Sequence, residues 1–205
     1  MYKLKIYLFL LLTIVTNHSI GKAPTKILVM GDSLSAGYGI DLKQGWVSLL
    51  EEELTKEHKV QIINASVSGE TTSGGKSRLP ALLSEHQPGI VILELGGNDA
   101  LRGQPLKILE QNLQSMIDAS QKANARVLLA GMQIPPNYGA RYSSQFKALF
   151  PTLAEKNSIA LVPFLLEGVG GNAELMQRDG IHPTADAQPI IAKNVKIELD
   201  KMLAN

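Results

Sequence analysis

KILVMGDSLSAGYG, residues 26–39, is the stretch that decides the fold. In the strand candidate Lys26–Met30, the four residues after the lysine are all apolar, without the polar alternation of a strand that has one face in water. The apolar run stops at the tripeptide Gly31-Asp32-Ser33. We therefore predict a parallel strand that is covered on both faces and that holds Ser33 at its carboxyl end.

Four more apolar runs resemble this one: Val60–Asn64, Ile90–Leu95, Arg126–Ala130 and Ile159–Val162. Helical patterns lie between and after the runs, at Trp46–Glu57, Lys76–Glu85, Leu106–Ala123, Tyr142–Lys156 and Ala187–Leu203. Strands that alternate with crossover helices predict an open, doubly wound α/β sheet. Because no linker, repeat or low-complexity tract interrupts the pattern, we expect residues 24–205 to form a single domain.

The N-terminal residues 1–21 have the pattern of a secretory signal. Lys3 and Lys5 precede the apolar run Ile6–Val15, and small residues follow at positions where a signal peptidase cuts. The alternative is an uncleaved membrane anchor, but a spanning helix needs about 20 apolar residues, roughly twice this run. We expect cleavage after Gly21 or Ala23, export to the bacterial periplasm or the medium, and no membrane span in the mature chain.

Composition excludes several classes of protein. The formal net charge of +1 shows no basic surplus, so we expect no nucleic-acid partner. The chain has no cysteine, which excludes disulfides, thiolate metal sites, a cysteine nucleophile and a lipid-modified N-terminal cysteine. With 205 residues, 44% of them apolar, the chain is long enough for one domain with a full core.

Polar residues follow three of the predicted strands directly. They are Gly31–Ser33, the segment Ala65–Gly69 and the tetrapeptide Gly96–Asp99. In open α/β sheets ligands bind at the carboxyl ends of the strands. We expect the three groups to meet in one crevice.

Among the four histidines, His182 is the candidate for a catalytic base, because an aspartate three residues before it can bind its ring. His18 lies in the predicted signal, and His58 and His86 lie in polar runs expected at exposed helix ends. Asp179 precedes His182 by three residues across a glycine, so it can reach one ring nitrogen and fix the tautomer. The alternative is a surface pair in which Asp179 only caps a helix.

Ser33 fits two interpretations equally well, a nucleophile activated by a base or a serine that caps a helix. Acyl transfer would also need donors for an oxyanion, and three strand ends offer them. These donors are the Ser33 N–H, the Gly69 N–H and the Asn98 side-chain amide. The alternative for Gly69 and Asn98 is that they are ordinary turn residues.

The segment GETTSGGKS, residues 69–77, almost matches a phosphate-binding P-loop. That motif needs a glycine separated by four residues from its Gly-Lys-Ser, and at that position this chain has Glu70. We therefore do not expect nucleotide binding. The Gly-x-Ser-x-Gly elbow of the α/β-hydrolase fold is also absent from the sequence.

Four strings occur in the order of the sequence blocks of the SGNH (GDSL) hydrolases: GDSLSAGYG, NASVSGET, ELGGND and DGIHP, at residues 31–39, 64–71, 94–99 and 179–183. The chain resembles that family from about Lys26 to Met202, and most closely its periplasmic esterase and thioesterase members. The resemblance implies Ser33 as nucleophile, His182 as general base and Asp179 as the residue that orients the base. It also implies an oxyanion hole made by Ser33, Gly69 and Asn98.

The same resemblance implies a three-layer α/β/α sandwich on a five-stranded parallel sheet, a flavodoxin-like arrangement, with no cofactor and no metal ion. It implies a serine esterase that hydrolyses small-molecule acyl esters and thioesters, such as acyl-CoA, lysophospholipids and aryl esters of medium to long acyl chains. We expect a monomer.

The alternatives are a carbohydrate O-acetylesterase with the same triad and a non-catalytic binding module. A long acyl chain would need an apolar groove, for which the candidates are Leu34, Leu101, Ile134, Pro135 and Ile181.

Overall fold

A computed structural model describes residues 23–204 of the chain. The predicted secretory signal, residues 1–21, and His18 lie outside the described residues. Within residues 23–204, none of the helices combines the length and the hydrophobicity that crossing a bilayer requires.

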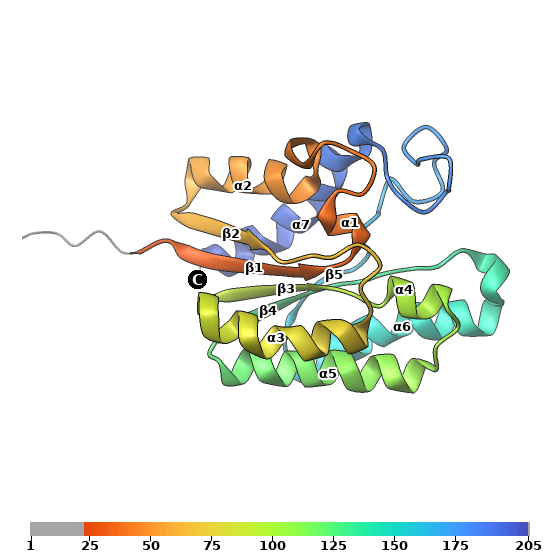
Figure 1. Cartoon of the computed structure of the whole chain (residues 1–205), viewed down its shortest axis with the longest axis horizontal. Coiled ribbons are helices and arrows are strands. Elements are labelled where there is room, and N and C mark those ends of the chain that lie inside the picture. The colour runs from red at the N-terminus through yellow and green to blue at the C-terminus, as the bar shows by residue number, and fades with distance from the viewer. Residues whose placement is uncertain (1–22, 205) are drawn as a thin grey trace, which may run out of the picture.

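Five parallel strands form one sheet in the order β2-β1-β3-β4-β5 (Figure 1). They are β1 (Thr25–Gly31), β2 (Val60–Asn64), β3 (Ile90–Glu94), β4 (Arg126–Ala130) and β5 (Ala160–Val162). This is the flavodoxin-like order, in which the direction of winding reverses between β1 and β3. In sheets of this kind ligands bind outside the carboxyl ends of the strands at the point of reversal, and β1 places Ser33 there.

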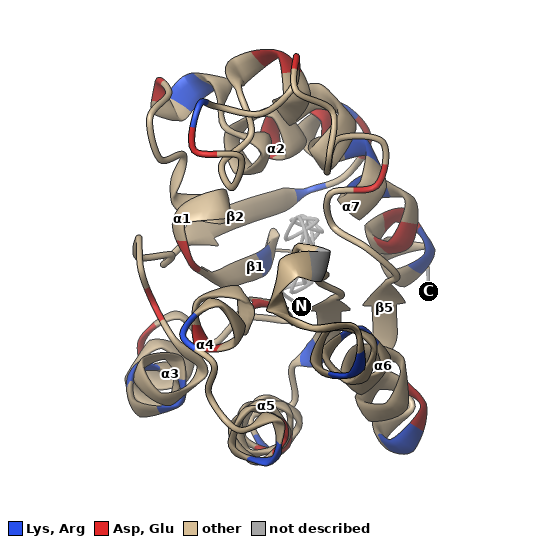
Figure 2. Cartoon of the chain, turned by 90° about the vertical axis from the view of Figure 1, so that its right-hand side faces the viewer, with Lys and Arg blue, Asp and Glu red and all other residues tan. Residues whose placement is uncertain are grey.

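Helices cover both faces of the sheet, which confirms the predicted three-layer sandwich. Figure 2 views the molecule from the carboxyl ends of the strands and shows α2 and α7 on one side and α3, α5 and α6 on the other. These helices are α2 (Trp46–Glu57), α3 (Thr72–His86), α5 (Leu106–Lys122), α6 (Ala140–Asn157) and α7 (Gln188–Leu203).

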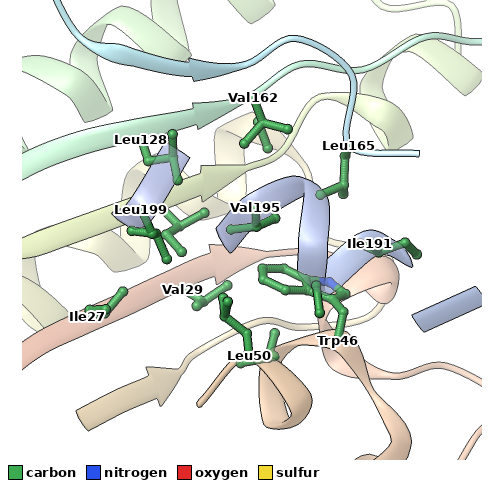
Figure 3. Close-up of a cluster of buried hydrophobic side chains, with 14 of the residues drawn as sticks. Ile27, Val29, Trp46, Leu50, Leu128, Val162, Leu165, Ile191, Val195 and Leu199 are labelled. Carbon is green, nitrogen blue, oxygen red and sulfur yellow. The ribbon is translucent and has the colours of Figure 1, made fainter. Parts of the chain in front are cut away.

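Each face of the sheet has its own core, which explains why the segment Ile27–Met30 of β1 is apolar at every position. Ile27 and Val29 point into one core, and Leu28 and Met30 point into the other. In the first core, the fully buried Trp46 lies among side chains of the sheet and of α7 (Figure 3). Side chains of a strand alternate between its faces, so the part of a strand that lies between two cores is apolar at successive positions.

The five predicted strands are confirmed, with ends that differ by at most one residue. The helix predicted to start at Lys76 starts instead at Thr72. Gly74 and Gly75 have low helix propensity, but the Thr71 side chain accepts a hydrogen bond from the Gly74 N–H and caps the helix. The other four predicted long helices end within two residues of their expected bounds.

Short helices that directly follow two strands were not predicted. They are α1 (Ser33–Ala36) after β1 and α4 (Gly97–Leu101) after β3. Three 3₁₀ turns, at Leu42–Gln44, Pro136–Tyr138 and Ala185–Ala187, were not predicted either. Single turns are too short to display a hydrophobic period, which is why sequence patterning misses them.

Candidate active site

The three polar segments that follow β1, β2 and β3 lie together, as predicted. After β2, the Val67 N–H donates to the Gly31 carbonyl over 3.1 Å. After β3, the Asn98 side chain donates to the Asp32 carboxylate over 2.9 Å. The segment that follows β1 therefore contacts both neighbouring strand ends.

Ser33, His182 and Asp179 form a continuous line of side-chain hydrogen bonds. The Ser33 Oγ lies 2.9 Å from His182 Nε2, across 149 residues of chain. On the other side of the ring, His182 Nδ1 lies 2.7 Å from Asp179 Oδ2. With the Nδ1 proton held by the carboxylate, Nε2 is left to accept the hydroxyl proton of Ser33.

The helix-cap interpretation of Ser33 is wrong, because the capping residue is Asp32. Asp32 Oδ1 accepts a hydrogen bond from the Leu34 N–H over 3.0 Å at the start of α1. Ser33 is the first residue of that helix, so its hydroxyl is not needed as a cap. The same arrangement leaves the hydroxyl available to His182.

Asp179 caps the turn that leads to His182 and also binds the His182 imidazole. Its Oδ1 accepts from the backbone N–H groups of Ile181 and His182, over 2.9 and 3.0 Å. Gly180 has a φ of 68°, in the left-handed region that glycine adopts without strain. The turn that Asp179 caps therefore also aims the other oxygen, Oδ2, at the ring.

The carboxylate of Asp179 is ionised at neutral pH. The hydrogen bonds from the His182 ring, the His182 N–H and the Ile181 N–H lower the pKa of Asp179 from 3.8 to about 2. The stability that this carboxylate contributes is present above its unfolded pKa and is lost as the pH falls through about 2. Its side chain is 40% exposed, so solvent screens much of the contribution.

Hydrogen bonds of Gln177 join two loops and hold the segment that carries His182 in place. The Gln177 side-chain amide donates to the Tyr38 carbonyl over 2.8 Å and to the Pro183 carbonyl over 2.9 Å. The Gln177 N–H donates to the His182 carbonyl over 2.7 Å, next to an antiparallel bridge between Met176 and Pro183. His182 is therefore held from both its own hairpin and the loop that follows α1.

The ring of Tyr38 lies against the imidazole of His182. The ring centroids are 4.3 Å apart at an angle of 35°, and Tyr38 is 52% exposed. Sequence reasoning did not select Tyr38 or Gln177, because neither carries a charge. The glycines that flank Tyr38, Gly37 and Gly39, were the only local signal.

Two of the three predicted oxyanion donors have unpaired backbone N–H groups. Neither the Ser33 N–H nor the Gly69 N–H donates a hydrogen bond to any of residues 23–204. Arg102 donates to the Gly69 carbonyl over 3.2 Å and ties that peptide to the end of α4. The Asn98 amide has two hydrogens and uses one for Asp32, so the other remains for a ligand.

Beneath the site lies a pair of buried acids, Asp32 and Glu94. Burial raises the pKa of Asp32 from 3.8 to about 6, against the lowering effects of the Leu34 N–H, His182 and Asn98. Burial and the nearby charge of Asp32 raise the pKa of Glu94 well above its usual range. Sequence reasoning missed Glu94, although an acid at the end of an otherwise apolar strand was a usable signal.

The pH dependence of stability should change when Asp32 is replaced by asparagine. Between pH 3.8 and 6 the folded protein keeps a proton on Asp32 that the unfolded chain has already released. Asp32 therefore lowers the free energy of unfolding as the pH rises, by about 3 kcal/mol over the window. Urea unfolding at a series of pH values between 3.8 and 6 should show wild type losing this amount of unfolding free energy relative to Asp32→Asn. Parallel curves for the two proteins would contradict the burial argument.

The predicted groove residues are not all equally accessible. Ile181 is 41% exposed beside His182, and Pro135 is exposed. Leu34 and Ile134 are half-buried and pack against the two cores, and Leu101 is half-buried. Three more exposed apolar side chains belong to the loops after α1 and β2: Tyr38, Leu42 and Val67.

The structure excludes a P-loop at residues 69–77. The Gly-Gly-Lys-Ser part lies inside α3, and the Lys76 ammonium donates to the Asn112 side chain over 3.2 Å. The Glu70 carboxylate pairs with Arg78 at 2.9 Å. A P-loop lysine must reach back to a phosphate, which this lysine does not do.

His58 and His86 lie at helix ends, as predicted, but they are not fully solvated. His58 is the C-terminal capping residue of α2, with Nε2 3.9 Å from an Asp200 oxygen, and its side chain is 28% exposed. His86 ends α3 with its side chain 25% exposed. Neither shares a hydrogen bond with Ser33, Asp179 or His182.

Known proteins resemble the chain over most of its length. The model of the GDSL-like lipase/acylhydrolase family matches residues 29–189. A protein named esterase TesA from Pseudomonas aeruginosa is 50% identical over 182 residues, which are 88% of this chain and 90% of the relative. Thioesterase 1/protease 1/lysophospholipase L1 from Escherichia coli K12 is 44% identical over 184 residues, 90% of this chain and 86% of the relative. The crystal structure of TesA superposes with a TM-score of 0.85 at 49% identity, covering 87% of this chain and all of that one.

Proposed function

The chain belongs to the GDSL-like lipase/acylhydrolase family and is an ester-bond hydrolase, and we propose that it cleaves acyl esters and thioesters through an acyl-enzyme on Ser33. The observation that carries this proposal is the line of hydrogen bonds from Ser33 through His182 to Asp179. The inclusion of thioesters is supported by the name of the relative from Escherichia coli, thioesterase 1.

In the first step, His182 Nε2 accepts the hydroxyl proton as Ser33 Oγ forms a bond to the acyl carbon. The carbonyl electron pair moves to the oxygen and gives a tetrahedral oxyanion. The ring then carries a positive charge, which the ionised Asp179 carboxylate stabilises at 2.7 Å from Nδ1. Asp179 stays ionised throughout and also keeps the ring in the orientation that faces Ser33.

In the second step, the bond from the acyl carbon to the leaving oxygen or sulfur breaks. His182 returns its proton to that alcohol or thiol, and the acyl group stays on Ser33. Water then attacks the acyl carbon while His182 accepts one of its protons. When the second oxyanion collapses, the bond from the acyl carbon to Ser33 Oγ breaks and the acid is released. His182 returns its proton to Oγ and restores the hydroxyl, so the steps balance without a cofactor.

The oxyanion would be bound by the N–H groups of Ser33 and Gly69 and by the free amide hydrogen of Asn98. Support comes from the two unpaired backbone donors and from the bond that directs Asn98 toward Asp32. Donors of this kind act on charge that develops in the transition state and little on the ground state. Their loss should therefore lower kcat more than it raises KM.

Replacement of Asn98 by alanine should lower kcat by about 10²- to 10³-fold with KM nearly unchanged. The substitution removes one oxyanion donor and also the hydrogen bond to Asp32. Steady-state kinetics should be normalised to active sites, because the lost bond also lowers stability. A raised KM with unchanged kcat would show that Asn98 binds the ground state of the substrate instead.

The substrate class that we propose is small-molecule esters and thioesters with a medium or long apolar acyl chain. Four exposed apolar side chains, Tyr38, Leu42, Val67 and Ile181, belong to the loops that carry or contact Ser33 and His182. Burying such surface against an acyl chain contributes about 25 cal/mol per Å². We further propose that the enzyme acts as a monomer.

Hydrolysis of p-nitrophenyl esters from acetate to palmitate, with acyl-CoA assayed in parallel by thiol release, tests this function. We expect a maximum at medium or long chains and loss of activity in Ser33→Ala. Activity on acetate alone would contradict the apolar acyl specificity. Absence of activity that depends on Ser33 would contradict the mechanism.

Export is proposed from the N-terminal sequence, whose signal pattern would be cleaved to leave a single domain from about residue 24. The experiment is N-terminal sequencing of protein recovered from the periplasmic fraction of a bacterial host. We expect the mature chain to start directly after residue 21, 22 or 23. Recovery of uncleaved protein in the cytoplasm would contradict export.

A further inference from the structure

The end of the central strand β3 holds a buried carboxyl group, Glu94, that the mechanism above does not use. Glu94 has no exposed surface, and Gly31 of β1 is its partner in the parallel register. A polar group without water costs free energy unless hydrogen bonds satisfy it. The bonds that Glu94 makes therefore indicate why it lies there.

One oxygen of Glu94 binds two residues on either side of the proposed nucleophile, Asp32 and Ser35. Glu94 Oε2 accepts from the backbone N–H of Asp32 over 3.1 Å and from the hydroxyl of Ser35 over 2.5 Å. Asp32 and Ser35 are themselves only 3% exposed. The other oxygen, Oε1, is buried and has no partner among residues 23–204.

Gly31 leaves the space that this arrangement needs. A Cβ atom at Gly31 would lie 2.6 Å from Glu94 Oε2 and 2.6 Å from Ser35 Oγ. Both distances are too short for real contacts, so any larger residue would displace the carboxyl group or the serine. The glycine before Asp32 and Ser33 is thus required by the buried carboxyl group beneath the turn.

We propose that Glu94 is a positioning residue that fixes Ser33 through Asp32 and Ser35, which lie on either side of Ser33 in the turn after β1. Asp32 precedes Ser33 and Ser35 follows it by two residues, so both sides of the nucleophile are held by one acceptor anchored in the sheet. This proposal rests on the proposed function of Ser33. Glu94 touches neither the substrate nor the reacting atoms and acts only through the backbone turn.

The proposal predicts that the acceptor oxygen matters and the charge does not. Burial beside Asp32 favours the neutral acid, as its raised pKa reflects. Glutamine keeps an acceptor oxygen at nearly the same shape, whereas methionine has a similar length and no such acceptor. Without the acceptor, the Asp32 N–H and the Ser35 hydroxyl lose their partner in a dry site and the turn relaxes. A displacement of about 1 Å at the nucleophile costs roughly 10²-fold in rate.

The experiment compares Glu94→Gln and Glu94→Met in the full-length mature protein on one p-nitrophenyl ester. We expect kcat per active site to fall about 10²-fold in Glu94→Met, with KM changed less than about threefold, and to return to within about threefold of wild type in Glu94→Gln. The control is Ser120→Ala, which also removes a buried hydrogen bond, to the Met116 carbonyl in α5. It should lower stability and leave kcat per active site unchanged.

The variant Ser35→Ala removes one of the two hydrogen bonds that Glu94 Oε2 accepts. It tests the proposal even if Glu94→Met does not fold. We expect it to lower kcat per active site by about tenfold, which is the effect of roughly one 1.4 kcal/mol interaction. Wild-type kcat in a folded Glu94→Met or in Ser35→Ala would overturn the proposal. An inactive wild type would instead overturn the proposed function, so the two failures are distinct.

Discussion

Replacing Ser33 by alanine is expected to lower kcat by about 10⁴- to 10⁶-fold and to leave the fold intact. The substitution removes the only atom that can bond to the acyl carbon in the proposed mechanism. Its cost in stability should be small, because the Ser33 hydroxyl bonds to His182 alone and Asp32 caps the helix. The rate that remains would come from the oxyanion donors and substrate binding.

Ester hydrolysis and thermal unfolding of the variant check this prediction together. The matched control is Ser115→Ala on the exposed side of α5, where the hydroxyl bonds only to the Gln111 carbonyl. The control should keep wild-type kcat, and both variants should unfold near the wild-type temperature. Wild-type turnover by Ser33→Ala would mean that the nucleophile is another group.

Asp179→Asn should lower kcat by about 10³- to 10⁴-fold with little change in KM. An asparagine oxygen can still accept from the N–H groups of Ile181 and His182, so the turn should persist. Its amide nitrogen would, however, face His182 Nδ1 and donate to it. The ring proton would then move to Nε2, which could no longer accept the proton of Ser33. The 40% exposure of Asp179 should keep the loss at or below that of a fully buried aspartate.

Steady-state kinetics of Asp179→Asn beside Asp186→Asn separate this role from a general effect of charge. Asp186 is an exposed acid in the 3₁₀ turn shortly after His182, and no hydrogen bond links it to the ring. Its replacement should leave kcat within about twofold of wild type, as surface substitutions usually do. A loss below tenfold in Asp179→Asn would contradict the role of the carboxylate in orienting the base.

The sheet was predictable from sequence because both faces of each strand are chemically constrained. A strand that contributes to two cores is apolar at successive positions, and the polar residues after it mark its end. The long helices were predictable from the helical spacing of their apolar residues. The start of α3 was not predictable, because the hydrogen bond that Thr71 accepts at the start of the helix outweighs the low helix propensity of two glycines. The helices α1 and α4 are too short to show the helical period of apolar residues.

Ser33, His182 and Asp179 could be selected because few residue types perform nucleophilic and base chemistry and because strand ends converge. Sequence spacing also placed Asp179 within reach of the ring. The contacts of Glu94, Tyr38 and Gln177 join residues 59 to 139 positions apart, through hydrogen bonds to backbone groups or to a small hydroxyl. Such partners leave no local pattern, so only the folded structure reveals them.

Covalent trapping of the nucleophile tests the central claim most directly. The mature enzyme should be incubated with a p-nitrophenyl alkylphosphonate, and the modified residue should be located by peptide mass spectrometry. We predict one adduct per chain, on Ser33, forming in step with the loss of esterase activity and absent from Ser33→Ala. Full loss of activity with the adduct on another residue, or with no adduct on Ser33, would contradict the account.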